Sequence, residues 1–297
     1  MRARTLLQRA LIIRENSLGR THAELVDLLK SLAALYQDNG DCLDAQSCLE
    51  RAVAIQESEL GREHADLALT LNDLGFVLEY AGDYEASQTA YERALAITVR
   101  VHGEHSAEVA ACCNSLAIVL ENQHDIVGAK ALHERSLSIR LQVLSPDHLH
   151  VAESQYNLAK LWQAEALSSS AAFYDEDQRQ QALATARALH EQALATYHAK
   201  LGVRLPGGVS ASAALRAPTL QLRIYAHRVL YVCTCDSTEL QPAHLDVAMI
   251  LDNLALIAEA CGGEGGEAEA LAFSERAELI RQAHDEHGGG GRLDGGA

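Results

Sequence analysis

Hydrophobic residues recur at helical spacing along the first half of the chain. Between residues 26 and 36 the apolar side chains fall on one helical face, at Val26, Leu29, Leu32, Ala33 and Tyr36. The segment Asn39-Gly40-Asp41 follows, and it joins a glycine that ends one helix to an aspartate that starts another. A second apolar face runs from Ala45 to Ile55 and stops before Gly61. The pattern predicts two helices joined by a tight turn.

The same pattern returns every 42 residues. The link after each helix pair aligns in register as Leu18-Gly19, Leu60-Gly61, His102-Gly103 and Leu144-Ser145. A small residue recurs on the first helix of each pair, at Ala33, Gly75, Ala117 and Ala159. A histidine follows three of the links, at His22, His64 and His148, and we expect it to cap the next helix or to bond the link. Because a lone helix pair cannot bury both apolar faces, the repeat predicts a stack of such pairs.

This unit resembles the tetratricopeptide repeat (TPR). The resemblance depends on the residues Leu74-Gly75, Leu78, Gly82-Asp83-Tyr84, Tyr91 and Ala94, with matching residues in the other units. The 42-residue period and the LG-x-x-H link resemble the subclass found in kinesin light chains and nephrocystin-3-like proteins. The resemblance implies an all-α fold, a right-handed α-α superhelix of about five helix pairs with one irregular insertion. It also implies that the first helix of each pair lines a concave groove.

The repeat register divides the chain into segments. A regular array is expected over 1–164, with a half repeat, units at about 20–60, 61–102 and 103–144, and the first helix of a fourth unit from 145. The segments after it are an insertion at 165–178, the second helix of the fourth unit at 179–202, an irregular segment at 203–241 with a helix over 220–235, a terminal unit at 242–283 with its turn at 262–266, and a disordered glycine-rich tail at 284–297. Residues 1–18 match only a second helix, and Leu6, Ile12 and Ile13 do not form a polar cap. One interpretation is that this helix acts as a cap; because array caps are polar, we expect instead a fragment or truncated form of a longer array.

Polar residues on the first helices, away from the packing stripe, form the predicted groove set. Asparagine suits such a groove because its amide offers a donor and an acceptor to a peptide backbone. The alternative is that these side chains are solvated or bond a neighbouring turn. The predicted partner-binding residues are Lys30, Asn72, Asp73, Glu79, Asn114, Ser115, Glu121, Asn157, Lys160 and Asn253.

Charge changes the partner that this groove would accept. The chain has 24 basic and 41 acidic residues and a net charge of −17, which argues against a nucleic-acid ligand. Within the groove set only Lys30 and Lys160 are basic, so we expect a basic or neutral protein or peptide partner. The resemblance to kinesin light chains implies basic groove side chains that bind acidic cargo peptides, and this sequence departs from that. The Lys, Arg and Asn clamp of chaperone-binding members is likewise not matched.

No motif for catalysis or for a cofactor is present: the chain lacks G-x-x-x-x-G-K-[ST], G-x-G-x-x-G, G-x-S-x-G and H-E-x-x-H. Cys233 and Cys235 with His227 form the best candidate for a metal or thiol site, although zinc sites need four ligands at other spacings. Cys112 and Cys113 lie on a packing helix and are expected in the core. Seven cysteines without framework spacing indicate free thiols in a reducing, cytoplasmic compartment. Association with cytoskeleton or cilium is implied by the family resemblance alone.

The sequence therefore predicts a non-catalytic scaffold or adaptor that binds a partner peptide or helix, with neither nucleic acid nor membrane as a partner. A second hypothesis is the sensor array of a larger protein, such as a nucleotide-binding regulator, and the start within a repeat motivates it. A third hypothesis is a metal- or thiol-dependent enzyme built on Cys233, Cys235 and His227. The pattern names no partner and no oligomeric state.

Overall fold

In a computed structural model, the described residues are 2–167, 176–200, 243–261 and 264–288. They form eleven α-helices and one 3-10 helix. The chain divides into two compact units, Met1–Val143 (unit 1) and Leu144–Ala297 (unit 2). The all-helical fold expected from the repeat is confirmed: it is a solenoid of sequential helix pairs.

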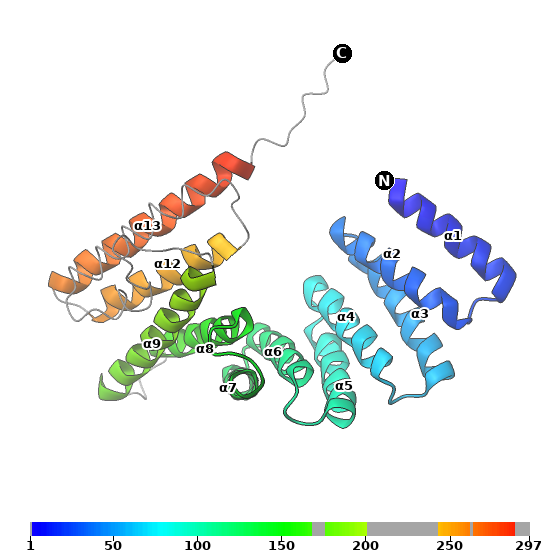
Figure 1. The fold of residues 1–297 in the computed structure, drawn as a ribbon, viewed down its shortest axis with the longest axis horizontal. Coiled ribbons are helices and arrows are strands. Elements are labelled where there is room, and N and C mark those ends of the chain that lie inside the picture. Colours follow the sequence, from blue (N-terminus) through cyan, green and yellow to red (C-terminus); the bar gives the residue numbers. More distant parts are fainter. Residues whose placement is uncertain (1, 168–175, 201–242, 262–263, 289–297) are drawn as a thin grey trace, which may run out of the picture. The chain divides into compact units, whose positions relative to one another are not determined.

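Unit 1 contains a single helix followed by three helix pairs (Figure 1). Its elements are α1 (Arg2–Leu18), η1 (Ala23–Leu25), α2 (Val26–Asp38), α3 (Cys42–Leu60), α4 (Ala65–Ala81), α5 (Tyr84–His102), α6 (Ala107–Asn122) and α7 (Ile126–Val143). Each helix packs against the next one along the chain, and the first helices α4 and α6 also contact each other. This is the stack of pairs that the 42-residue period predicts.

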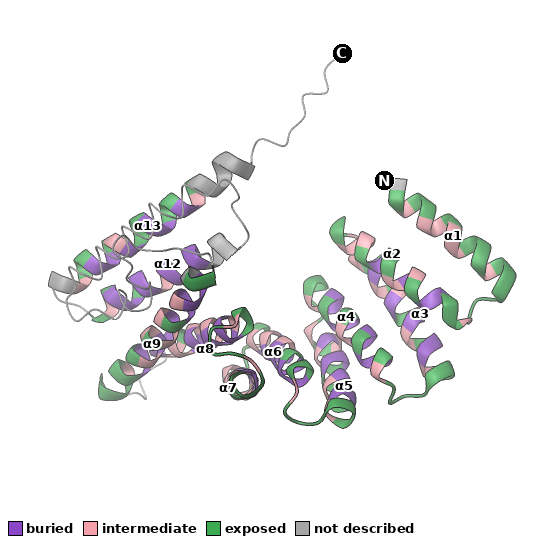
Figure 2. Ribbon diagram, viewed as in Figure 1, coloured by how far each residue is buried: buried purple, intermediate pink, exposed green. Residues whose placement is uncertain are grey.

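The core of unit 1 is assembled from the apolar stripes that the sequence shows. One cluster joins Ala33 and Leu49 of the first pair to Leu74 and Leu78 of the second. Figure 2 shows the buried residues on the facing sides of successive helices. Burial of this kind supplies about 25 cal/mol per Å² of apolar surface, which explains why neighbouring pairs stabilise each other.

The recurring histidines cap the helices that follow them. Nδ1 of His22 accepts a hydrogen bond from the Glu24 amide at 3.2 Å, and Nδ1 of His64 accepts one from the Asp66 amide at 3.2 Å. Nδ1 of His148 does the same for the His150 amide at 3.1 Å. In the third unit Ser106 replaces the histidine, and its hydroxyl accepts from the Val109 amide. The predicted structural role of these histidines is confirmed.

The tight turn inside each of the three pairs of unit 1 contains a left-handed residue. Gly40 and Gly82 have φ values of 79° and 82° at equivalent positions. The third pair places His124 there, with φ of 64°. Side chains other than glycine are disfavoured in this region because Cβ approaches the following carbonyl oxygen. The sequence therefore keeps the turn geometry in the third pair with a less suitable residue.

Unit 2 contains α8 (Leu149–Leu167), α9 (Glu176–Lys200), α12 (Ala243–Cys261) and α13 (Glu264–Gly288). Helices α8 and α9 pair, α12 and α13 pair, and α9 packs on α12 although many residues separate them in sequence. Leu194 and Tyr197 of α9 share a core cluster with Leu251 of α12 and Phe273 of α13. The terminal helix pair therefore stacks on the fourth as a regular unit would.

Two expectations for this region are wrong. The tail expected to be disordered from 284 is helical as far as Gly288, because 284–287 contain no glycine or proline and simply extend α13. The turn expected at 262–266 is shorter, since α13 begins at Glu264 and includes Gly265 and Gly266. A Cβ at Gly266 would lie 2.6 Å from the Ala258 carbonyl oxygen, so glycine lets α12 and α13 approach closely. The helix expected over 220–235 and most of the segment 203–241 lie outside the described residues.

Candidate functional site

Three successive first helices of unit 1 border a cavity of about 460 Å³. The lining side chains come mainly from α2, α4 and α6, with two from the second helices α3 and α5. They are Lys30, Ser31, Ala33, Ala34, Gln37, Leu49, Asn72, Asp73, Phe76, Tyr91 and Ser115. Four of the predicted partner-binding residues, Lys30, Asn72, Asp73 and Ser115, therefore meet at one cavity, which is called the groove below. Its volume is within the range of about 300–1,000 Å³ that is usual for ligand pockets.

The basic residue of the groove is already paired. Nζ of Lys30 lies 3.1 Å from Oδ2 of Asp73, across the gap between α2 and α4. Both side chains are partly exposed, so this ion pair contributes little to stability. Its importance lies in the charge: Asp73 compensates the ammonium group that an acidic ligand would need.

Tyr91 reaches the groove from the second helix α5. Its ring is buried, and burial beside the Glu79 carboxylate raises the pKa of Tyr91 well above its usual range, so the phenol keeps its proton. The hydroxyl donates to Glu79 and accepts from Ser115. Burial, opposed by that hydrogen bond, raises the pKa of Glu79. Tyr91 fits because Gly75 faces it: a Cβ at Gly75 would lie 2.9 Å from the ring.

In the next two helix pairs, other residues at the repeat positions of Glu79 and Tyr91 form the equivalent contact. Oε1 of Glu121 lies 2.8 Å from Nε2 of His133, and His133 is fully buried. In unit 2, Nε2 of His190 lies 3.3 Å from Oε1 of Gln163. Burial, with a smaller contribution from Lys160, lowers the pKa of His190 to about 4, so this histidine is neutral near pH 7. Glu79 and Glu121 therefore each bond a side chain on the second helix of their own helix pair.

The remaining predicted residues are placed as follows. Asn114 is only 5% exposed, because α6 contacts α4, α5 and α7 and leaves little of its surface open. The prediction that Asn114 faces a ligand is therefore not supported. Asn157, Lys160 and Asn253 belong to unit 2, on α8 and α12, and are half-buried. Nζ of Lys160 lies 5.8 Å from the centre of the Tyr156 ring on the same helix.

Sequence reasoning missed the contribution of the second helices to the groove. Tyr91 and Leu49 occupy the same repeat position, 42 residues apart, and both line the cavity. The signal was present in the repeat itself: the bulkier Tyr91 coincides with Gly75, where the other units have alanine. A large residue opposite a missing side chain indicates that the ring crosses toward the first helix.

Of the two groups of cysteines singled out in the sequence, the structure describes one and not the other. Cys112 and Cys113 are buried, as expected for core residues, and burial raises the pKa of both thiols. Cys233, Cys235 and His227 lie outside the described residues. Within the described ranges, no group of three or more His, Cys, Asp and Glu side chains is arranged to hold a metal ion. None of the helices described is long and apolar enough to cross a lipid bilayer.

The stacked helix pairs and the groove across their first helices define a helical-repeat protein of the solenoid class. Models of the tetratricopeptide repeat match residues 1–58, 24–98 and 66–126, and a further one matches residues 109–150. The chain belongs to the tetratricopeptide repeat family. Domains of this family are generally protein-binding scaffolds. No curated protein matches the chain in sequence.

Solved structures with similar folds include kinesin light chain-like TPR proteins. One is BtubC (BKLC) from P. vanneervenii, with a TM-score of 0.62 and 21% identity over 94% of this chain and 88% of that one. Another is a putative kinesin light chain from P. anserina with nearly identical TPR-like repeats, with a TM-score of 0.55 and 20% identity over 89% of this chain and 98% of that one. At these identities the likeness concerns the fold.

Proposed function

We propose that unit 1 is a non-catalytic scaffold that binds a peptide segment of a partner protein in the groove between α2, α4 and α6. The carrying observation is that one cavity collects polar side chains from three consecutive first helices together with the half-exposed ring of Phe76. Amide and hydroxyl groups of Asn72 and Ser115 suit a peptide backbone, and Phe76 offers apolar surface to a partner side chain.

The charges favour a basic or neutral segment. Lys30 is paired with Asp73, so the groove presents no uncompensated cation among its described lining residues. The Glu79 carboxylate lies beside the groove, bonded to Tyr91. The rings of Phe76 and Tyr80 are exposed one turn apart on α4, and aromatic faces attract ammonium and guanidinium groups. An acidic ligand would meet repulsion without a compensating cation.

A peptide library displayed on phage and selected against the full chain tests the proposal. Selected peptides are expected to be rich in lysine and arginine. One selected peptide, made as a fluorescent probe, should bind Asn72→Ala and Phe76→Ala about tenfold more weakly, which corresponds to a loss of about 1.4 kcal/mol. The control is Leu43→Ala, an exposed apolar residue on the second helix α3 and outside the groove.

Two results would contradict the proposal. One is a set of selected peptides rich in aspartate and glutamate. The other is a probe peptide that binds Asn72→Ala, Phe76→Ala and Leu43→Ala with the same affinity, because the groove would then not be the binding surface.

A further inference from the structure

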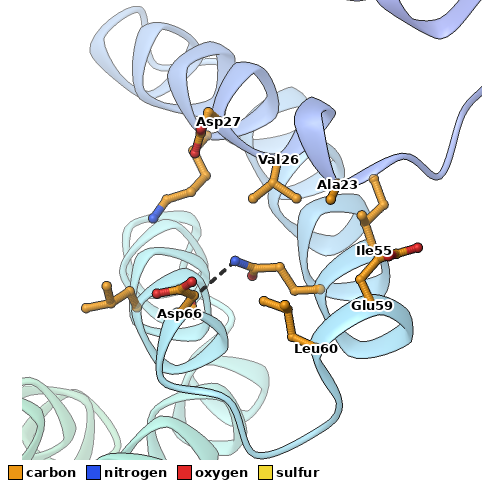
Figure 3. A pocket seen from close by; sticks show the side chains of 10 residues that line it. Ala23, Val26, Asp27, Ile55, Glu59, Leu60 and Asp66 are labelled. Atoms are coloured by element: carbon orange, nitrogen blue, oxygen red, sulfur yellow. Dashed lines mark hydrogen bonds between the residues drawn. The ribbon is translucent and has the colours of Figure 1, made fainter. Parts of the chain in front are cut away.

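A second cavity of unit 1 lies next to the groove, where η1, α2, α3 and α4 meet (Figure 3). Its volume is about 390 Å³. The lining residues are Ala23, Val26, Asp27, Lys30, Ile55, Gln56, Glu59, Leu60, Asp66 and Leu69. Lys30 borders both cavities, so the two are neighbours along the first helices. This second cavity is called the acidic cavity below.

Three carboxylates from three helices border the acidic cavity. Asp27 comes from α2, Glu59 from α3 and Asp66 from α4. Figure 3 shows Asp27 and Asp66 on the left, Glu59 on the right, and Val26 and Leu60 between them. The ammonium group of Lys30 is bound to Asp73, which lies outside this cavity, and Oδ2 of Asp66 is 3.6 Å from Nδ1 of His64. The cavity therefore combines an apolar wall with acceptor groups.

A buried acceptor without a partner lies in the same cavity. Gln56 is 6% exposed, and its Nε2 donates to the main-chain oxygen of Asp66 at 3.4 Å. That bond fixes which way the amide lies and leaves Oε1 buried with no hydrogen-bond partner. Buried polar atoms of native proteins are almost always bonded, so an orphaned acceptor in a cavity points to a donor that is supplied by a ligand.

The combination of Gln56, Asp27 and Glu59 is not repeated in the next unit, although the bond from Gln56 to the Asp66 main-chain oxygen has a counterpart one repeat earlier, from Arg14 to that of Glu24. At the position equivalent to Gln56, the next unit has Thr98, whose hydroxyl donates to the Ala94 carbonyl oxygen at 2.8 Å. The positions equivalent to Asp27 and Glu59 hold the apolar residues Leu69 and Val101. A residue needed for the stacking of every unit would recur. The acidic cavity therefore has a role that is separate from the fold.

We propose that the acidic cavity binds an arginine side chain of the partner. The alkyl part of that side chain matches the apolar wall of Val26, Ile55 and Leu60. Its guanidinium group has five N–H donors in one plane and no acceptor, so it can bond Gln56 Oε1 and a carboxylate together. This inference rests on the proposed peptide-binding function, and it assigns one position of the bound segment.

The test uses the full chain and a probe small enough to report on this cavity alone. N-acetyl-arginine amide is titrated while the side-chain amide of Gln56 is followed by NMR, with the signal assigned from Gln56→Leu. N-acetyl-citrulline amide is the control ligand, since it has the same shape without the charge. A saturable shift of the Gln56 signal is expected with the arginine probe, and binding of the citrulline probe should be at least about tenfold weaker.

Variants separate this site from general charge effects. Asp27→Asn should weaken binding of the arginine probe severalfold, whereas Asp44→Asn should leave it unchanged. The two residues form a matched pair, because both are exposed acids in the first turn of a helix and only Asp27 lines the cavity. Gln56→Leu should abolish binding of the probe while the chain stays folded, since it removes the unpartnered acceptor and only one long hydrogen bond, of 3.4 Å, to the Asp66 main-chain oxygen.

Equal shifts with the arginine and citrulline probes, or equal losses in Asp27→Asn and Asp44→Asn, would overturn the proposal. Its failure is distinguishable from failure of the proposed function. If library peptides bind in a Phe76-dependent way while the arginine probe leaves Gln56 unmoved, the groove stands and the arginine site does not. If the arginine probe binds and no Phe76-dependent peptide emerges, the cation site stands without the groove.

Discussion

Oε1 of Glu121 lies 2.8 Å from Nε2 of His133, a side chain with no exposed surface. The same two repeat positions are joined in the unit before by Glu79 and Tyr91 and in the unit after by Gln163 and His190. The first helix of a pair thus bonds its second helix through one polar contact that changes chemistry from unit to unit. In the first pair these two positions hold Gln37 and Leu49, which cannot form a polar contact of this kind.

Replacing Glu121 and His133 by the pair found at these positions in another repeat should cost little stability, whereas removing one partner alone should destabilise the chain. His133→Leu leaves the partly buried Glu121 carboxylate without its imidazole partner, and we expect a loss of about 1–3 kcal/mol in the free energy of unfolding. Glu121→Gln reproduces the Gln163–His190 pair and should cost less than about 1 kcal/mol. The double variant reproduces the Gln37–Leu49 combination and should recover at least half of the loss. Hydrogen exchange of α6 and α7 measures the effect locally.

The control for this set is Glu134→Gln, an exposed residue next to His133 on the same helix. It should leave the exchange rates of α6 and α7 unchanged. A double variant that is less stable than His133→Leu alone would show that the contact is not an exchangeable unit.

Gly75 and Tyr91 should be coupled in a double-mutant cycle. A methyl group at Gly75 meets ring atoms of Tyr91 at 2.9 Å, so Gly75→Ala forces the ring to move and should cost about 1–3 kcal/mol. In a Tyr91→Leu background the clash is gone, and the higher helix propensity of alanine should make the same change stabilising by up to about 1 kcal/mol. Urea denaturation of the four chains measures the coupling. Equal effects of Gly75→Ala in both backgrounds would contradict it.

His124→Gly should stabilise unit 1. The φ of 64° at His124 is unfavourable for a residue with a Cβ, and glycine adopts it freely, so we expect a gain of up to about 1 kcal/mol in the free energy of unfolding. Gln123→Gly is the matched control, since Gln123 has φ of −84°. Glycine relieves no strain there and only increases the conformational entropy of the unfolded chain. That control should lower stability. If both variants lower the thermal midpoint, the turn is not strained at His124.

Stability should fall in mild acid because of His190. Its pKa in the folded chain is about 4, below the value of about 6.5 expected when unfolded, so the unfolded state binds the extra proton between these values. The stabilisation that the neutral His190 side chain gives to the folded chain is complete above about pH 6.5 and is lost as the pH falls toward 4. Between pH 7 and pH 5 the loss amounts to about 2 kcal/mol.

Thermal unfolding at these two pH values, for the natural chain and for His190→Gln, isolates this contribution. The variant keeps a neutral polar side chain, so it should lose about 2 kcal/mol less than the natural chain. His150→Gln is the control for the loss of a histidine side chain, because His150 is exposed on α8. An unchanged pH dependence in His190→Gln would contradict the assignment.

The fold could be predicted because each local signal agreed with the others. The apolar stripe, the Asn39-Gly40-Asp41 turn and the histidine caps each recur at the same period, and a helix pair has few ways to bury its faces except by stacking. Predictions failed where the period stops. The glycines near 264 were interpreted as a turn, but packing of α13 on α12 places two of them inside a helix.

The groove could be predicted only in part. Register placed Lys30, Asn72, Asp73 and Ser115 on the first helices, and these four meet at one cavity. The same register placed Asn114 there, but the helices packed around α6 bury it. Position on a helix tells which side chains share a face, whereas the neighbouring helices decide how much of that face remains open.

The sequence by itself determined the helix pairs, their stacking order and the acidic character of the chain, because these depend on spacing and composition. Only the tertiary structure decided that Lys30 is compensated by Asp73 and that Gln56 keeps an unpartnered oxygen at the acidic cavity. Both facts arise between residues of different helices, where distances of a few ångströms set the sign of an interaction. A periodic pattern contains no such distances.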